Sequence, residues 1–285
     1  DVGENDLGPV GLPPASSAST WGARFGVRWH PDDGYPSGPR EGGPDDEPRD
    51  AWGVGRNYGW AAAEMMAGNW VAGATNEYMR NGNFNQTSPR SWWRNLTDGF
   101  KYDDNDFRTN QFIHSYNGNV YYNSARSNGL SFWPSAGYAA SGAFMWEFAG
   151  ETHPMSYNDM IATTVVGIGI GELTYRISSE ILDNQATGGK RFFKEFSSFF
   201  VDPIRGLNRL ISGRSTTSHA NPTDPMDWRP PHGSTLVGMG VRTIGQDNLT
   251  TDAKAYASLF FDHAYGNPWD NSRRKPFDYA EMNFQ

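Results

Sequence analysis

Seven ionisable residues lie between Phe107 and Asp183, in a segment whose runs of Gly, Ala, Ser and aromatic residues are otherwise suited to burial. They are His114, Arg126, Glu147, Glu151, Asp159, Glu172 and Arg176. A charged group inside a protein is costly unless it is paired or hydrogen-bonded. The segment therefore specifies either a structural polar network or a functional site.

Glu147 and Glu151 are four residues apart, so they share one face of a helix if that helix is continuous. Two carboxyl groups held close raise one another's pKa, which is how proton-transfer pairs and carboxylate metal sites are made. With His114 and Glu172 they form a candidate metal or catalytic set, although the Glu-x-x-His signature of helical di-iron proteins is absent. The structural alternative is that Glu147 pairs with Arg126 and that Glu151 lies near a helix end.

The other ionisable residues have structural explanations. Ser156 and Asp159 fit a helix-capping box, in which the serine oxygen accepts a backbone N–H and the acid three residues later returns a bond. Glu172 and Arg176 are four apart, in the order that favours an ion pair on a helix. Arg126, Asp159 and Arg176 are therefore expected in a structural polar network.

His114 is the candidate to test first, because imidazole changes charge near neutral pH in an ordinary environment. Its neighbours Phe112 and Tyr116 favour the alternative of a hydrogen-bonded core histidine. The candidates for catalysis are thus His114, Glu147, Glu151 and Glu172, and the sequence establishes none of them as catalytic. Whether this polar set binds a metal stays open.

Composition and motifs exclude several classes of function. The chain has no cysteine, which removes disulfides, thiolate zinc sites and cysteine nucleophiles. A formal net charge of −8, with no concentrated run of Lys and Arg, argues against a nucleic-acid partner. The sequence has no Gly-x-Ser-x-Gly elbow, no phosphate loop and no dinucleotide-binding glycine motif after a strand, and we predict no cofactor. The acidic stretch Tyr102–Phe107 lacks the spacing of a known calcium loop.

Apolar residues at three-to-four spacing predict an aromatic-rich helical domain over residues 51–214. The helices are expected at Ala51–Asn81, Arg90–Phe100, Gln111–Asn128, Ser135–Gly150, a stretch beginning after Pro154, and Arg191–Gly213, broken at Pro203. Gly167 and Gly171 lie four apart and would let another helix approach closely. In the last helix, the expected buried stripe consists of Phe192, Phe193, Phe196, Phe199 and Phe200.

The rest of the chain predicts irregular and β structure. Residues 1–50 form a Pro/Gly-rich irregular arm with a strand pattern at Trp21–His30, and residues 215–233 form a Pro-rich link. In residues 234–285, alternation predicts an antiparallel hairpin of Ser234–Ile244 and Ala253–Tyr265, with a third strand within Pro276–Phe284. We expect an α+β fold: a mainly helical block with close glycine-mediated packing, followed by a C-terminal antiparallel β hairpin or small sheet. Because so few strands need a covering layer, either the helical block packs on them or the β segment is truncated, and we favour truncation.

Several ordered blocks carry a resemblance to a known family: Asp106–His114, Tyr121–Trp133, Trp146–Glu147 with Glu151, Ser156–Asp159, Gly171–Ser178 and Pro203–Gly213. Together they resemble the uncharacterised bacterial family called domain of unknown function 3943, over roughly residues 96–284. The resemblance implies a secreted protein of a Gram-negative cell envelope, at the outer membrane or its periplasmic face, whose strands would begin an outer-membrane barrel. It implies no activity. Ser115 departs from the family pattern, in which proline follows the histidine.

Two functions from different classes follow. The first is a non-catalytic cell-envelope protein, an outer-membrane-associated scaffold or subunit of a larger assembly, with other envelope proteins or the membrane interface as partners. Aromatic residues make up 14% of the chain, which favours such contacts. The second is an envelope hydrolase or metal-dependent enzyme centred on His114, Glu147, Glu151 and Glu172. The sequence indicates no particular substrate or small-molecule ligand.

Overall fold

The computed structural model describes residues 20–28, 49–80, 86–104, 109–230, 233–244, 254–267, 269 and 276–284. Most of the expected arm, residues 1–19 and 29–48, lies outside the described residues, as do residues 231–232 of the expected link and the hairpin loop at 245–253. The chain divides into two compact units. A helical unit lies within Asp32–Pro231 and Asn267–Asp278, and a β unit lies within Asp1–Pro31, His232–Gly266 and Tyr279–Gln285.

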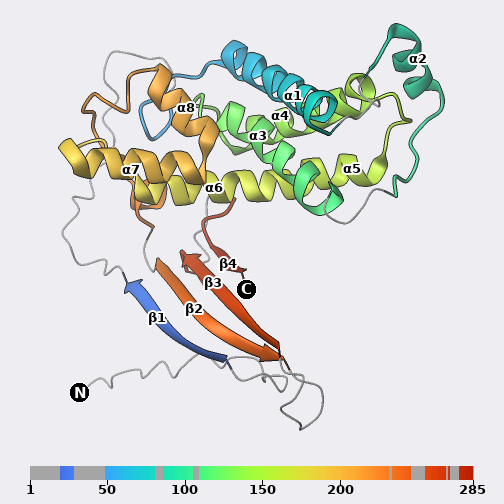
Figure 1. The fold of residues 1–285 in the computed structure, drawn as a ribbon. Coiled ribbons are helices and arrows are strands. Elements are labelled where there is room, and N and C mark those ends of the chain that lie inside the picture. Colours follow the sequence, from blue (N-terminus) through green and yellow to red (C-terminus); the bar gives the residue numbers. More distant parts are fainter. Residues whose placement is uncertain are drawn as a thin grey trace, which may run out of the picture. The chain divides into compact units, whose positions relative to one another are not determined.

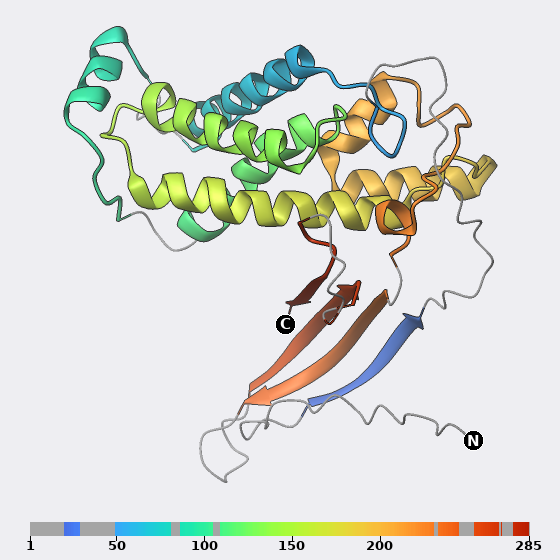
Figure 2. The same ribbon diagram turned by 180° about the vertical axis from the view of Figure 1, so that it is seen from behind.

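The α-helices described in the helical unit are α1 (Tyr58–Arg80), α2 (Pro89–Thr97), α3 (His114–Arg126), α4 (Phe132–Met145), α5 (Tyr157–Ile161), α6 (Gly167–Ile181), α7 (Gly188–Val201), α8 (Pro203–Ile211) and α9 (Pro225–Trp228). All of the expected helices are present, and α9 follows no pattern that we had identified. Helix α3 is central, because it contacts α1, α4 and α6. Figures 1 and 2 show α5 and α6 in line as one long rod, with α7 packed beside α6.

Three π-helical turns interrupt these helices: η1 (Thr109–Ile113), η2 (Trp146–Gly150) and η3 (Ala162–Val166). Turn η1 leads directly into α3, η2 continues α4, and η3 joins α5 to α6. A π turn holds about one residue more than an α turn, so it rotates the side chains that follow it by about 100° around the helix axis. The turns therefore change which residues face the interior.

Glycines let α3 and the rod of α5 to α6 approach closely, as expected. A Cβ atom placed on Gly118 of α3 would lie only 1.7 Å from the carbonyl oxygen of Thr163, and one on Gly167 would lie 2.5 Å from the Cα of Gly118. A Cβ on Gly171 would lie 2.6 Å from the ring of Tyr122. No side chain larger than hydrogen fits at these contacts, so the spacing of the glycines fixes the separation of the helices.

Polar side chains fill much of the interior. Among the described residues of the chain, 26 polar or charged residues are buried, against 16 hydrophobic ones. Helix α7 was expected to bury its phenylalanines, and that prediction was wrong: their exposed fractions run from 42% at Phe199 to 81% at Phe200. The buried residues of α7 are Arg191 and Ser198. Arg191 donates to four backbone carbonyls, and Ser198 forms a hydrogen bond with Ser178 at 2.8 Å, so the polar face packs inward.

The β unit is a four-stranded antiparallel sheet in the order β1 (Thr20–Arg28), β2 (Ser234–Ile244), β3 (Lys254–Tyr265) and β4 (Ala280–Phe284). The hairpin and the third strand confirm the expected α+β fold. Strand β1 comes from the segment in which alternation indicated a strand, and it pairs with β2. Within the described residues, no helix combines the length and hydropathy needed to cross a bilayer.

Candidate functional site

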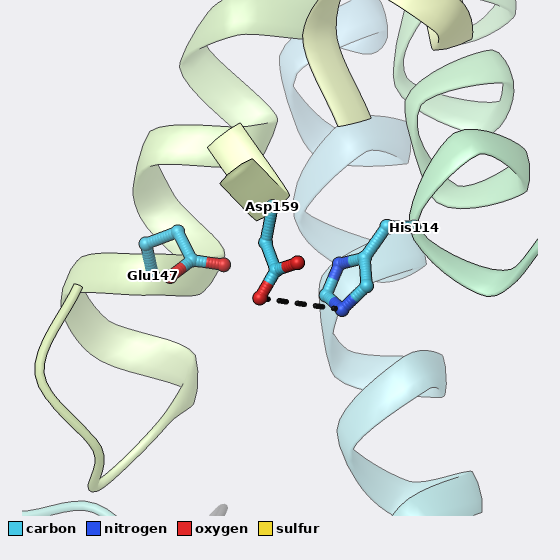
Figure 3. A group of neighbouring side chains, drawn as sticks. All are labelled: His114, Glu147 and Asp159. Atoms are coloured by element: carbon cyan, nitrogen blue, oxygen red, sulfur yellow. Dashed lines mark ion pairs between the residues drawn. The ribbon is translucent and has the colours of Figure 1, made fainter. Parts of the chain in front are cut away.

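His114, Glu147 and Asp159 converge in the helical unit. One nitrogen or oxygen atom from each side chain lies within 4.8 Å of the others. All three residues are buried, with exposed fractions of 5%, 2% and 1%. Figure 3 shows them pointing toward a common centre from three separate segments of helix. Imidazole nitrogen and carboxylate oxygen are both common metal ligands, so this grouping is a candidate metal centre.

Each of the three residues lies in or beside a π-helical turn. His114 follows η1, Glu147 is within η2, and Asp159 is in α5, just before η3. The amide of Asn95 in α2 supports η2 by donating to the carbonyls of Glu147 and Glu151, at 3.3 and 2.9 Å. Turns of this kind are frequent at functional sites, where they re-aim side chains. Local helix geometry therefore orients all three ligand candidates.

Hydrogen bonds fix these side chains. The backbone N–H of Ser156 donates to Glu147 Oε2 at 2.7 Å, and His114 Nδ1 lies 3.4 Å from Thr163 Oγ1. The backbone N–H of Asp159 donates to Ser156 Oγ at 3.2 Å, which is one half of the expected capping box. In the other half of the box, the Ser156 backbone N–H was expected to donate to Asp159, but it donates to the Glu147 carboxylate. The carboxylate of Asp159 lies 3.8 Å from His114 Nε2.

Burial and like charge keep these carboxyl groups from ionising easily. Burial, followed by the Glu151, Asp159 and Asp103 carboxyls, raises the pKa of Glu147 to about 9, against a lowering by the Ser156 N–H. Burial also raises the pKa of Glu151 to about 7, although the Trp146 indole N–H, which donates to Glu151 at 2.5 Å, lowers it.

Burial also shifts the pKa values of Asp159 and His114 away from the charged forms. Burial raises the pKa of Asp159 and lowers that of His114, while the attraction between the two groups opposes both shifts. In the described part of the chain, the charged groups that shift the pKa of Glu147, Glu151 and Asp159 include no Lys or Arg. Within the described residues, the basic group that offsets this acidity is the His114 imidazole, whose own pKa burial lowers, so a bound cation would favour ionisation of the carboxyls.

A cleft of about 480 Å³ adjoins the cluster. Its walls include His114 and Glu151, together with Trp146, Asp103 and His153. A molecule in this cleft can therefore approach the imidazole and the carboxyl group of Glu151. The volume is within the range of small-molecule sites in proteins.

Glu172, the fourth candidate from the sequence, lies in a different cluster. Its carboxylate accepts from Arg126 Nε and from Arg176 Nε, both at 2.8 Å, and from the Tyr122 hydroxyl at 2.6 Å. Burial alone would raise the pKa of Glu172, but the two guanidinium groups and these hydrogen bonds lower it. The expected ion pair of Glu172 with Arg176 is confirmed. The pairing of Arg126 with Glu147 was wrong, because Arg126 binds Glu172 instead.

Sequence reasoning had placed Asp159 in the structural network, whereas the structure places it against His114 and Glu147. The sequence contained a signal that Asp159 and Glu147 differ from Glu172. Glu172 has an arginine four residues later, but neither Glu147 nor Asp159 has a basic residue three or four positions away. Acids in a buried segment without such a neighbour must find another partner.

Comparisons with known proteins agree with the sequence motifs. Residues 99–204 match the model of one protein family, and this segment holds His114, Glu147 and Asp159 as well as Glu151. The sheet and nearly all of the block Pro203–Gly213 lie beyond the matched residues. No curated protein and no solved structure matches the chain. The matching family is described as Domain of unknown function (DUF3943), so the resemblance is confirmed over residues 99–204.

Proposed function

We propose that the protein is a metal-dependent enzyme of the cell envelope, with a divalent ion held by His114, Glu147 and Asp159. The observation that carries the proposal is the approach of one ligand atom from each residue to within 4.8 Å of the others. The donor set combines imidazole with carboxylates and contains no thiolate, which suits Zn²⁺ or Mn²⁺. The unbalanced acidity of the cluster supports a cation as its natural partner.

Three protein ligands are the number found in catalytic zinc sites, where the remaining position is open to water or substrate. Such an ion supplies Lewis acidity and activates water. Glu151 lines the adjoining cleft, where its carboxylate is placed to accept and return a proton. We therefore propose hydrolysis as the reaction class and Glu151 as the general base.

The first experiment measures metal binding by calorimetry, with the metal-depleted full chain titrated with ZnCl₂ or MnCl₂ near neutral pH. We expect one ion per chain. His114→Ala, Glu147→Gln and Asp159→Asn should each weaken the affinity by about tenfold or more, because even the loss of a group that only supports a ligand has an effect of that size. His219→Ala changes an exposed histidine and serves as the matched control.

Catalytic function is tested separately with Glu151→Gln. This variant should retain metal binding and lose hydrolysis in a screen of ester, amide and phosphoester substrates with the metal-loaded chain. A folded wild-type chain that binds neither ion, or binds it equally well in all three ligand variants, would remove the basis of the proposal.

A second candidate function, a scaffold or subunit of a larger envelope assembly, is favoured by the many exposed large hydrophobic residues. They include Trp70 at 74%, Trp93 at 69% and Trp133 at 73% exposure. Large exposed apolar side chains mark interaction sites where they form patches. Mass measurement of the protein purified from its native envelope in mild detergent tests this candidate, because a monomer without a co-purifying partner contradicts it.

A further inference from the structure

Helix α7 presents a row of phenylalanines to the outside, which we call the Phe face: Phe192, Phe193, Phe196, Phe199 and Phe200, exposed by 63%, 68%, 59%, 42% and 81%. The rings contact one another along the helix. Those of Phe192 and Phe196 are stacked with centroids 6.0 Å apart, and Phe193 meets Phe192 edge-on. Five neighbouring aromatic side chains on one helix exceed what scattered surface hydrophobics explain.

Polar contacts on the opposite side hold the Phe face outward. Lys194 Nζ donates to the carbonyl of Ile181 at 3.0 Å, and Glu195 pairs with Arg209 of α8 at 2.7 Å. Arg191 is also anchored on the inner side. Rolling α7 over to bury its phenylalanines would break all of these bonds. The orientation is therefore built into the fold.

Helix α8, like α7, buries basic side chains and exposes apolar ones. Its buried residues include Arg205 and Arg209, whereas Leu207, Leu210 and Ile211 are exposed by 42%, 61% and 61%. The arginines are satisfied inside the unit, where Arg205 donates to the carbonyl of Tyr175 at 2.8 Å. Two consecutive helices thus direct basic residues inward and apolar residues outward. Figure 1 shows α7 and α8 as neighbours, in agreement with their packing contacts.

Charge around the Phe face is positive, although the whole chain carries −8. At about 100° per residue, Lys190 lies beside one edge of the Phe face, whereas Lys194 lies on the inner side, where it donates to the Ile181 carbonyl. Residues 188–213 are all described, and their only acids are Glu195, which is paired with Arg209, and Asp202, which is buried. Lys190 is exposed. The charge that this region offers a partner is therefore basic.

We propose that the α7–α8 face docks on the surface of an anionic lipid bilayer. Aromatic and aliphatic side chains on one face, flanked by lysine, are the features that let a helix lie in the headgroup region. Phe side chains would enter the acyl boundary, while the exposed Lys190 beside them would meet lipid phosphates. This inference is independent of the proposed metal site, since none of its residues belongs to the cluster around His114.

Sedimentation with lipid vesicles tests the proposal on the full chain. The probe is vesicles of equimolar phosphatidylglycerol and phosphatidylcholine, compared with pure phosphatidylcholine. We expect wild-type protein to bind the anionic vesicles more strongly. The triple variant Phe192→Ser, Phe196→Ser, Phe200→Ser should lose about tenfold or more in partitioning, because it removes three exposed rings. Lys190→Glu should lose several-fold on anionic vesicles and little on neutral ones.

The matched control is Trp70→Ser, which removes an equally exposed aromatic residue from α1. It should bind vesicles as the wild type does, and all variants should keep the helical circular dichroism spectrum. Absence of wild-type binding, equal binding by the triple variant, or equal binding to neutral and anionic vesicles would each overturn the proposal. Self-association that disappears in the triple variant, without vesicle binding, would assign the face to protein contacts instead.

Discussion

Glu147 and Glu172 are both buried acids of the same helical unit, yet their surroundings shift their pKa values in opposite directions. Glu172 is held between Arg126 and Arg176, and its pKa is lowered despite complete burial. Glu147 lies near Asp159, Glu151 and His114, and its pKa is raised to about 9. The cluster around Glu172 contains two guanidinium groups, whereas the basic member of the cluster around Glu147 is one imidazole whose pKa is lowered by burial.

This contrast distinguishes buried polar groups that stabilise the fold from buried polar groups that are available to a ligand. A buried acid that is matched by guanidinium groups holds helices together, and it has no capacity left for a ligand. An acid that shares its surroundings with other acids destabilises the fold when it ionises, so its presence calls for a proton or a cation. The second cluster also adjoins a cleft of about 480 Å³. Substitutions at Glu172, Gly118 and Glu147 test this difference between the two clusters.

The largest effect is expected from Glu172→Gln. It leaves the partly buried Arg126 and the buried Arg176 without their common counter-charge, which should lower the free energy of unfolding by about 3–5 kcal/mol near neutral pH. Because the pKa of Glu172 is lowered in the fold, its contribution is present above the ordinary value of 4.5 and is lost as pH falls. Urea unfolding measures both effects, with the exposed Glu281→Gln as control. A variant as stable as the wild type would mean that the ion pairs are not structural.

A smaller loss is expected from Gly118→Ala, one helical turn from both His114 and Tyr122. The new methyl group would meet the Thr163 carbonyl, so α3 must move away, at a cost of about 1–3 kcal/mol. Thr163 also contacts His114, so metal affinity should fall with stability. The control is Gly137→Ala on α4, where a Cβ meets nothing within 4 Å and where alanine should stabilise by about 0.5–1 kcal/mol. Equal effects of the two substitutions would contradict the close-packing argument.

The smallest effect has the opposite sign. Glu147→Gln should stabilise the metal-free chain at mildly alkaline pH by about 1 kcal/mol or more, since one pKa unit corresponds to about 1.4 kcal/mol. Because the pKa of Glu147 is raised, the contribution of this group to the stability of the wild type is greatest below 4.5 and falls as pH rises toward about 9. Thermal unfolding in chelator across this range should show a flatter dependence for the variant. Destabilisation by this substitution would show that Glu147 has a structural role like that of Glu172.

Much of the secondary structure could be predicted because its signals are local. Alternation placed β2 and β3 within a residue of their ends, and Pro203 separated α7 from α8 as expected. The i, i+4 order of Glu172 and Arg176 predicted their ion pair. The π turns gave no such signal. They alter the helical period at Glu147 and beside His114 and Asp159, which is where a regular 3.6-residue pattern misleads.

The sequence by itself determined the α+β class, the approximate places of most helices and strands, the glycines at 167 and 171 that admit a close neighbour, and the set of ionisable residues that the core must accommodate. Only the tertiary structure decided how those residues divide: Arg126 with Glu172, 46 positions away, and Asp159 with His114 and Glu147. It also decided that α7 turns its phenylalanines outward. The physical reason is the same in each case. Propensity and spacing act along one segment, whereas charge pairing and burial depend on which faces of distant helices meet.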